Sequence, residues 1–191
     1  MADIGHLGGL QPVEALDLDN YKDSQEPAPL PKKGRYTVQA PDSFPASAFG
    51  RTQAGAFSAQ IDPKILGPTN EGYVIRFTKV SGKPFKRGGV TVSQVGDYLR
   101  ACGYRGKISD EQQMADAIEQ TANRTYEVDL EWRAYNKNTK FVLEGMDKFP
   151  SDGNGGHQPW VEDPVDKDPE TGKPVKVRAN LVVNRFIAAS M

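Results

Sequence analysis

The stretch Tyr126-Glu127-Val128-Asp129-Leu130-Glu131-Trp132 alternates aromatic or aliphatic residues with acidic ones without exception. Successive side chains of a β-strand point to opposite faces of the sheet, so this pattern predicts a strand with one buried and one solvent-facing side. Residues 134–139 have the composition of a turn, and residues 140–143 (Lys-Phe-Val-Leu) predict the return strand. The fold is therefore expected to contain an antiparallel hairpin in the second half of the chain.

Further strands are predicted on both sides of this hairpin, at residues 35–40, 56–61, 71–80 and 175–188, with 85–90 as a partner for 71–80. The segment 71–80 places Tyr73, Ile75 and Phe77 on one face, which makes these three residues candidates for the core. Pro41 ends the first of these strands, and a Pro-rich, Gly-rich sequence separates the others. The chain thus reads as mainly β, with many turns.

Two short helices are predicted between the strands. Thr91 with Gln94, and Ser109 with Gln112, have the spacing of a capping box. The first helix is expected to end before Gly103, and Cys102 on its apolar face is expected to be a core residue. The order of strands, helical insert and strands favours an α+β fold built on a small antiparallel barrel, of which the partly open oligonucleotide-binding (OB) barrel is one type.

The domain organisation follows from composition. Residues 1–31 are acidic and Pro-rich and are expected to form a mobile, disordered leader, whereas residues 32–191 form a single OB-like domain with a long loop at 150–174. One cysteine among 191 residues excludes an intramolecular disulfide framework, and no apolar run is long enough to span a membrane. We expect a cytoplasmic protein.

The charge is strongly partitioned along the chain, although the net charge is only −1. Residues 1–31 carry −5, and residues 76–107 carry +7, from eight basic residues and a single acid, Asp97. A compact basic block attracts polyphosphate, because phosphate neutralisation releases condensed counterions. The alternative is a solvated basic hairpin.

Catalytic motifs are lacking: the sequence has no Gly-rich phosphate loop, and neither His6 nor His157 lies near an acid and a nucleophile in an arrangement that suggests a catalytic triad. We expect no enzyme, no cofactor and no metal. The acids of 162–170 leave one alternative open, because carboxylates can bind Mg²⁺ or Ca²⁺, but Pro164 and Pro169 interrupt them and solvation is the simpler interpretation.

Binding chemistry is richer than catalytic chemistry. Single-stranded nucleic acid is held by a basic groove along its phosphates and by aromatic rings that stack on its bases. Both ingredients occur around 76–87 and around 132–140, where Phe85 and Tyr135 are the favoured stacking residues because they adjoin turns. The candidate DNA-binding residues are Arg76, Lys79, Lys83, Phe85, Lys86, Arg87, Trp132, Tyr135, Lys137 and Lys140.

Four short patterns point to a known family. They are Lys33-Gly34-Arg35-Tyr36, Glu71-Gly72-Tyr73, Val95-Gly96-Asp97-Tyr98-Leu99-Arg100-Ala101 and Arg133-Ala134-Tyr135-Asn136-Lys137, followed by a Phe-Pro loop and a basic final strand. This succession, over residues 32–188, resembles small single-stranded DNA-binding proteins encoded by tailed bacteriophages.

The resemblance implies an OB barrel that coats single-stranded DNA without sequence preference in the host cytoplasm. It also implies phage replication or recombination proteins as partners, and a homo-oligomer is compatible with it. The chain differs from many such proteins because it ends in Arg185-Phe186-Ile187-Ala188, not in an acidic tail. The acidic leader at the front suggests a hypothesis: it covers the basic groove until DNA displaces it.

Two other functions remain open. The first is a structural protein of the virion, in the head or tail, that makes contacts between subunits. The second is a metal-dependent nuclease that uses the acids of 162–170.

Overall fold

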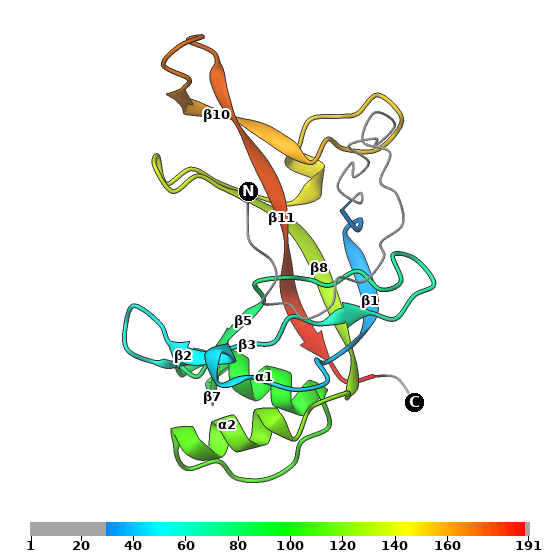
Figure 1. Cartoon of the computed structure of the whole chain (residues 1–191), viewed down its shortest axis with the longest axis vertical. Helices are drawn as coiled ribbons and strands as arrows, with labels where there is room; N and C mark the ends of the chain where they lie inside the picture. The colour runs from blue at the N-terminus through cyan, green and yellow to red at the C-terminus, as the bar shows by residue number, and fades with distance from the viewer. Residues whose placement is uncertain (1–29, 190–191) are drawn as a thin grey trace, which may run out of the picture.

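The computed structural model describes residues 30–189, and Figure 1 shows the arrangement of its elements. The main sheet is antiparallel, in the order β10-β11-β8-β1-β4, with β9 also paired to β8. Its strands are β1 (Gly34–Gln39), β4 (Lys64–Ile65), β8 (Thr125–Tyr135), β9 (Val142–Glu144), β10 (Trp160–Lys167) and β11 (Pro174–Ile187). The curled sheet and two helices at its lower end make this a mainly β, α+β fold.

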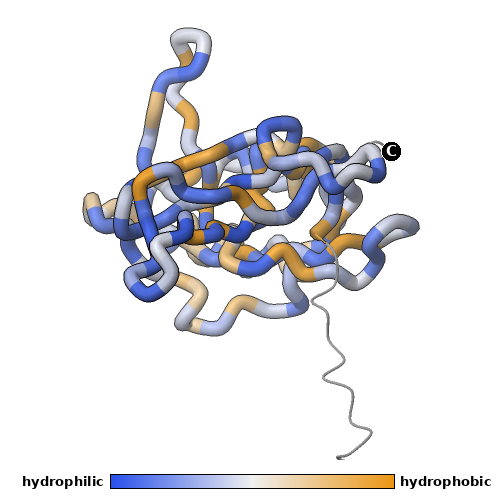
Figure 2. The backbone as a smooth tube through the Cα atoms, turned by 90° about the horizontal axis from the view of Figure 1, so that it is seen from above, coloured by the Kyte–Doolittle hydropathy of each residue, from blue (hydrophilic) through white to orange (hydrophobic). Residues whose placement is uncertain are grey.

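The strand predicted from strict alternation is confirmed and forms the centre of the sheet. Tyr126, Val128, Leu130 and Trp132 are all 4% exposed or less. In Figure 2 hydrophobic and hydrophilic residues alternate along the backbone of the body in the same way. The prediction that the acidic side faces solvent is wrong at Glu131, which is buried and pairs with Lys33 at 2.7 Å. Glu131 also accepts hydrogen bonds from the Trp132 and Met146 amides, which compensate its carboxylate for the lost water.

The predicted strand 71–80 is mostly wrong. Only its end, β5 (Lys79–Ser81), is a strand, and it lies in a small sheet with β2 (Phe49–Arg51) and β3 (Phe57–Gln60). Upstream, Val74 makes a single bridge to Lys64, and the chain turns at Phe77, which has φ +61°. Residues 85–90 do not pair with this segment. They contribute to a separate two-stranded hairpin, β6 (Phe85–Arg87) with β7 (Val90–Val92), called here the β6–β7 arm.

The two predicted helices are present as α1 (Gln94–Ala101) and α2 (Glu111–Glu119), with caps shifted by one or two residues. The N-caps are Ser93, which accepts from the Gly96 amide, and Asp110, which accepts from the Gln113 amide. Thr91 belongs to β7 and pairs with Lys86, so it is not available as a cap. Gly103 has φ +82° just after α1, and Cys102 is buried, both as predicted.

The predicted loop 150–174 is wrong in its second half, which contains β10. This strand pairs with β11 through a bulge between Glu162 and Lys167, which accommodates Pro164. The buried Asp163 fixes the bulge, because it accepts hydrogen bonds from the Val165 and Asp166 amides. The part of the predicted loop before β10 is irregular, with a single bridge between Ser151 and His157. The short helix η3 (Met146–Lys148) precedes this loop, and a second short helix, η2 (Ala46–Ala48), precedes β2.

The boundary of the predicted leader also shifts. Leu30 packs partly against the core, and the Pro31 carbonyl accepts a hydrogen bond of 2.8 Å from the Trp132 indole, so these two residues belong to the domain. Residues 1–29 lie outside the described part of the chain, so the hypothesis that they cover a basic groove concerns residues that the structure does not describe. Within residues 30–189, no helix is long and apolar enough to cross a membrane.

Candidate nucleic-acid interface

The C-terminal strand β11 has two different edges. β8 pairs with it as far as Ile187, but on the other edge β10 pairs with it only up to Arg178. Within residues 30–189, no strand pairs with residues 180–187 on that second edge. This leaves a long stretch of β11 bordered by loops, the β6–β7 arm and α1.

Two cavities lie end to end along this stretch. The upper cavity, about 690 Å³, is lined by residues 178–182 of β11 and by residues 72–77. The lower cavity, about 470 Å³, is lined by residues 183–187 of β11 and the following Ala188, by the β6–β7 arm, and by α1 with Arg105 just after it. We call the two together the β11 groove. Its charged and aromatic side chains are Tyr73, Arg76, Phe77 and Arg178 in the upper part, and Phe85, Arg87, Asp97, Arg100, Arg105, Arg185 and Phe186 in the lower part.

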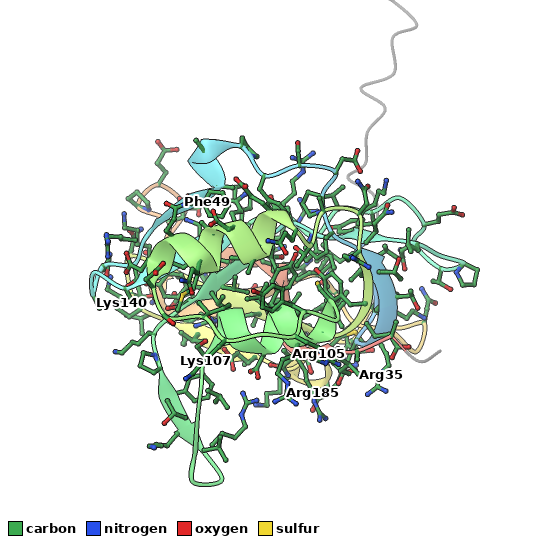
Figure 3. All side chains as sticks on the ribbon, turned by 90° about the horizontal axis from the view of Figure 1, so that it is seen from below. Arg35, Phe49, Arg105, Lys107, Lys140 and Arg185 are labelled. Atoms are coloured by element: carbon green, nitrogen blue, oxygen red, sulfur yellow. The ribbon has the colours of Figure 1, made fainter. Side chains whose placement is uncertain are left out.

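The groove is strongly cationic. Six arginines line it, and Asp97 is the one acid among its lining residues in the described chain. All six are exposed, and Figure 3 shows Arg105 and Arg185 on one side of the molecule, with Lys107 and Arg35 along the same side. A guanidinium stays charged at any physiological pH, and its planar fork matches the oxygens of a phosphate. The groove therefore suits a polyanion.

Phe77 is the most unusual side chain of the groove. It is 79% exposed, and its φ of +61° lies in the left-handed region, which is costly for a residue with a bulky side chain. Backbone strain of this kind clusters at functional sites.

The neighbours of Phe77 explain its position. Ile75 is buried at 1%, and Thr78 is also buried, with its hydroxyl donating to the Ile75 carbonyl at 2.7 Å. The Thr78 amide in addition donates to Asp62. Because both flanking residues are pinned to the core, Arg76 and Phe77 form the tip of a tight turn and project outward.

Two further rings line the groove beside Phe77. Phe85 is 40% exposed on the β6–β7 arm, with the Arg87 guanidinium carbon 5.2 Å from its ring centroid. Tyr73 is half-buried, and this burial raises the pKa of its phenol, against the opposing effect of Arg178 and Arg76. Its hydroxyl is thus protonated at neutral pH and adds no negative charge to the groove. Phe186, in contrast, packs inward against Tyr98 at 5.7 Å between centroids.

The structure brings only part of the predicted site together. Arg76 lines the upper cavity, and Phe85 and Arg87 line the lower one, with Lys86 beside them on the arm. Lys79 on β5 and Lys83 before the arm are exposed but line neither cavity.

Trp132 is not available for stacking, and the prediction that it is a DNA-binding residue is wrong. It is 4% exposed, edge-on to Phe149 at 5.5 Å, and its indole nitrogen is bound to Pro31. The alternation that predicts its strand also predicts an inward side chain at this position.

Tyr135, Lys137 and Lys140 form a separate cluster on the hairpin between β8 and β9. None of the three lines either cavity. Ala134, next to Tyr135, pairs with Ala179 of the upper cavity, so this hairpin begins near the upper end of the groove and leads away from the lower cavity. The hairpin also adjoins acids, because Asn136 donates to both Asp163 and Asp166.

Sequence reasoning missed Phe77, Arg100, Arg105, Arg178 and Arg185 as site residues. Arg100 and Arg105 belong to the +7 block, and Arg185 to the basic final strand, so charge alone marks their segments. Nothing in the sequence marks Phe77, since its alternation with Ile75 favours a buried position.

The acids of 162–170 do not form a metal centre in the described chain, where no group of three or more potential ligands is found. Asp163 is occupied by protein donors. Burial opposes its ionisation, but hydrogen bonds from Thr139, from two amides and from Asn136 outweigh this and hold the pKa of Asp163 below its ordinary value. Its role in the structure is to fasten β10 to the β8–β9 hairpin.

The chain was also compared with known proteins. No family model, no curated protein and no solved structure matches it.

Proposed function

We propose that this chain binds single-stranded DNA along the β11 groove, without catalysis and without sequence preference. The observation that carries the proposal is Phe77, a strained and 79% exposed aromatic ring, at a groove lined by six arginines and one acid. A ring on a cationic groove is the combination that single-stranded nucleic acid requires.

The chemistry of the groove favours single strands over duplex. Phe77, Phe85 and Tyr73 can stack only on bases whose faces are free, and base pairing within a stacked duplex hides those faces. Sequence tolerance follows from the arginines, because contacts to phosphate position the chain of nucleotides but do not read the bases. Lys137 and Lys140 lie outside the proposed path.

The fold is compatible with this function. A curled antiparallel sheet with a helical segment supports an OB-like barrel, a fold that commonly binds oligonucleotides across its open face. Together with the resemblance to phage proteins, this favours a role in protecting single-stranded DNA during phage replication or recombination in the host cytoplasm, alongside replication or recombination proteins.

A titration tests the proposal. A fluorescently labelled single-stranded homopolymer is titrated with the full chain at two salt concentrations, next to a duplex of the same length. We expect affinity for the single strand to fall steeply with salt and to exceed that for the duplex. The double variant Arg100→Gln/Arg105→Gln should bind weaker at low salt and show a salt slope smaller by about 1.4, because each phosphate neutralised on a single strand contributes about 0.7 to the slope.

A control variant separates the groove from general charge. Lys167→Gln/Lys173→Gln removes two exposed charges at the far end of the β10–β11 hairpin, away from both cavities. We expect it to bind nearly as well as the unaltered chain. Equal losses of affinity for both double variants, or no binding by the unaltered chain, would refute the proposal.

A structural role in the virion remains the second candidate, and exposed apolar residues on projecting hairpins favour it. Tyr135 and Val142 are opposite each other on β8 and β9 and are 46% and 44% exposed, and Val165 on β10 is 73% exposed. Such residues suit contacts between subunits. Light scattering at low and high salt distinguishes the two: salt-independent self-association, unaffected by DNA, supports the virion role.

A further inference from the structure

Asp97 is an exception within the β11 groove. It is the one carboxylate among the groove's lining residues in the described chain, and the same lower cavity holds Arg87, Arg100, Arg105 and Arg185. Its Oδ2 lies 3.1 Å from Nη1 of Arg87, and its side chain is 27% exposed. An acid at this point opposes the binding of any polyanion, so its presence needs a reason.

Part of the reason lies in the β6–β7 arm. Residues 83–91 are all exposed, and a two-stranded hairpin is only marginally stable by itself in water. The Arg87–Asp97 ion pair ties this arm to the first turn of α1, where a negative charge is also favourable for the helix. With the pair in place, Arg87 lies next to the Phe85 ring and both line the cavity.

We infer that Asp97 acts as an internal substitute for a phosphate: its carboxylate neutralises Arg87 in the free protein and gives Arg87 up to a backbone phosphate when nucleic acid binds. This inference rests on the proposed function. A carboxylate and a phosphate present similar oxygen acceptors to the guanidinium fork, so one can replace the other without moving Arg87 far. Asp97 thus keeps the arm and Arg87 in a binding-ready position, at the expense of affinity.

The inference predicts that a substitution at Asp97 tightens DNA binding, whereas substitution of the groove arginines weakens it. Asp97→Asn removes the competing anion but keeps the size of the side chain, so single-stranded DNA should bind tighter, by about twofold to fivefold, the range expected for one exposed ion pair. In the unaltered chain the freed Asp97 carboxylate attracts a cation when Arg87 moves to the phosphate, which offsets part of the ion release. Asp97→Asn removes this offset, so the salt slope should steepen by up to about 0.7, the contribution of one phosphate.

The matched control is Glu119→Gln. Glu119 is exposed on α2 and lines neither cavity, and its substitution changes the net charge by the same amount. We expect only a small gain in affinity, with the slope unchanged. Asp97→Ser is a second variant in case Asp97→Asn lowers the urea midpoint, because serine is tolerated in the first turn of a helix.

A variant pair distinguishes competition from a purely structural role. If Asp97 competes for Arg87, Asp97→Asn should tighten binding clearly more in the unaltered chain than in the Arg87→Gln background, where only general repulsion is relieved. An equal gain in both backgrounds, or no gain in the unaltered chain, means that Asp97 does not act through Arg87, and the inference is wrong. Unchanged or weaker binding by folded Asp97→Asn and Asp97→Ser also overturns it, while a wild-type chain that binds no DNA overturns the proposed function instead.

Discussion

Replacing Phe77 by glycine separates the stability of the fold from its proposed function. Glycine adopts a φ of +61° without strain, which removes about 1–2 kcal/mol of strain from the folded state. Against this, the side chain is 79% exposed, so only about a fifth of the 1.5–3 kcal/mol for a fully buried ring is lost, or about 0.3–0.6 kcal/mol. The greater freedom of glycine in the unfolded chain costs a further ~0.5–1 kcal/mol.

These contributions nearly cancel. The free energy of unfolding of Phe77→Gly should therefore lie between about 0.6 kcal/mol below and 1.2 kcal/mol above that of the unaltered chain. The loss of one base stack, in contrast, costs about 1–3 kcal/mol of binding, or roughly fivefold to 150-fold in Kd. A large loss of affinity with little change in stability is the expected signature of a residue retained for binding.

The assay combines fluorescence anisotropy with a labelled single-stranded oligonucleotide and urea unfolding of the same preparations. Asn123→Gly is the matched control, because Asn123 also has a φ of +61° but lines neither cavity. It should leave Kd unchanged. A Kd for Phe77→Gly within twofold of the unaltered chain would falsify the assignment of Phe77 as a stacking residue, and a stability loss above about 2 kcal/mol would show that the ring serves folding.

Three further predictions concern the core, an ion pair and the acidic leader. Trp132→Ala should lower the free energy of unfolding by about 3–5 kcal/mol, because it empties a buried site; a urea midpoint close to that of the unaltered chain contradicts the core position. Burial raises the pKa of Glu131, but Lys33 and two backbone amides outweigh this and lower the pKa in the folded state. The carboxylate therefore stabilises the fold above its unfolded pKa, and this stability is lost as the pH falls through the folded pKa. Glu131→Gln should remove this contribution to the pH dependence of the urea midpoint in acid. Removal of residues 1–29, which carry −5, should tighten DNA binding at low salt and change little at high salt; equal Kd values at low salt dismiss the hypothesis that the leader covers the groove.

The elements that could be predicted from the sequence are those where one local pattern decides the structure. β8 follows strict alternation and β11 does so as far as Val183, and both helices begin within one or two residues of their predicted caps. The segment 71–80 also alternates, but two tertiary anchors decide its conformation: Ile75 in the core, and Asp62, which holds the Thr78 amide. The local pattern does predict Ile75 in the core, but the contact with Asp62, 16 residues away, is not visible in a local window, and for this reason the pattern predicts Phe77 inside although it lies outside.

The candidate site could also be predicted only in part from the sequence, but for a different reason. Charge along the sequence identifies the segment 76–107, but a groove also needs the opposite wall, and β11 comes from the far end of the chain. The sequence analysis includes Trp132 as a further stacking candidate, after Phe85 and Tyr135, because it neighbours Tyr135 and two lysines. In a strand such neighbours point to opposite faces, so proximity in sequence says little about a shared surface.

A single irregularity in β11 links the core to the groove. From Val177 to Val183 the odd-numbered residues point toward the core, and strict continuation would bury Arg185 and expose Phe186. A register shift between Val183 and Arg185 reverses this order, so Arg185 pairs with Asp129 on the outer face while Phe186 pairs with the buried Val128. One bulge thus fills the core against Tyr98 and releases an arginine to the lower cavity. Bulges that redirect a side chain are frequent next to functional sites, and the position of this one supports β11 as one wall of the β11 groove.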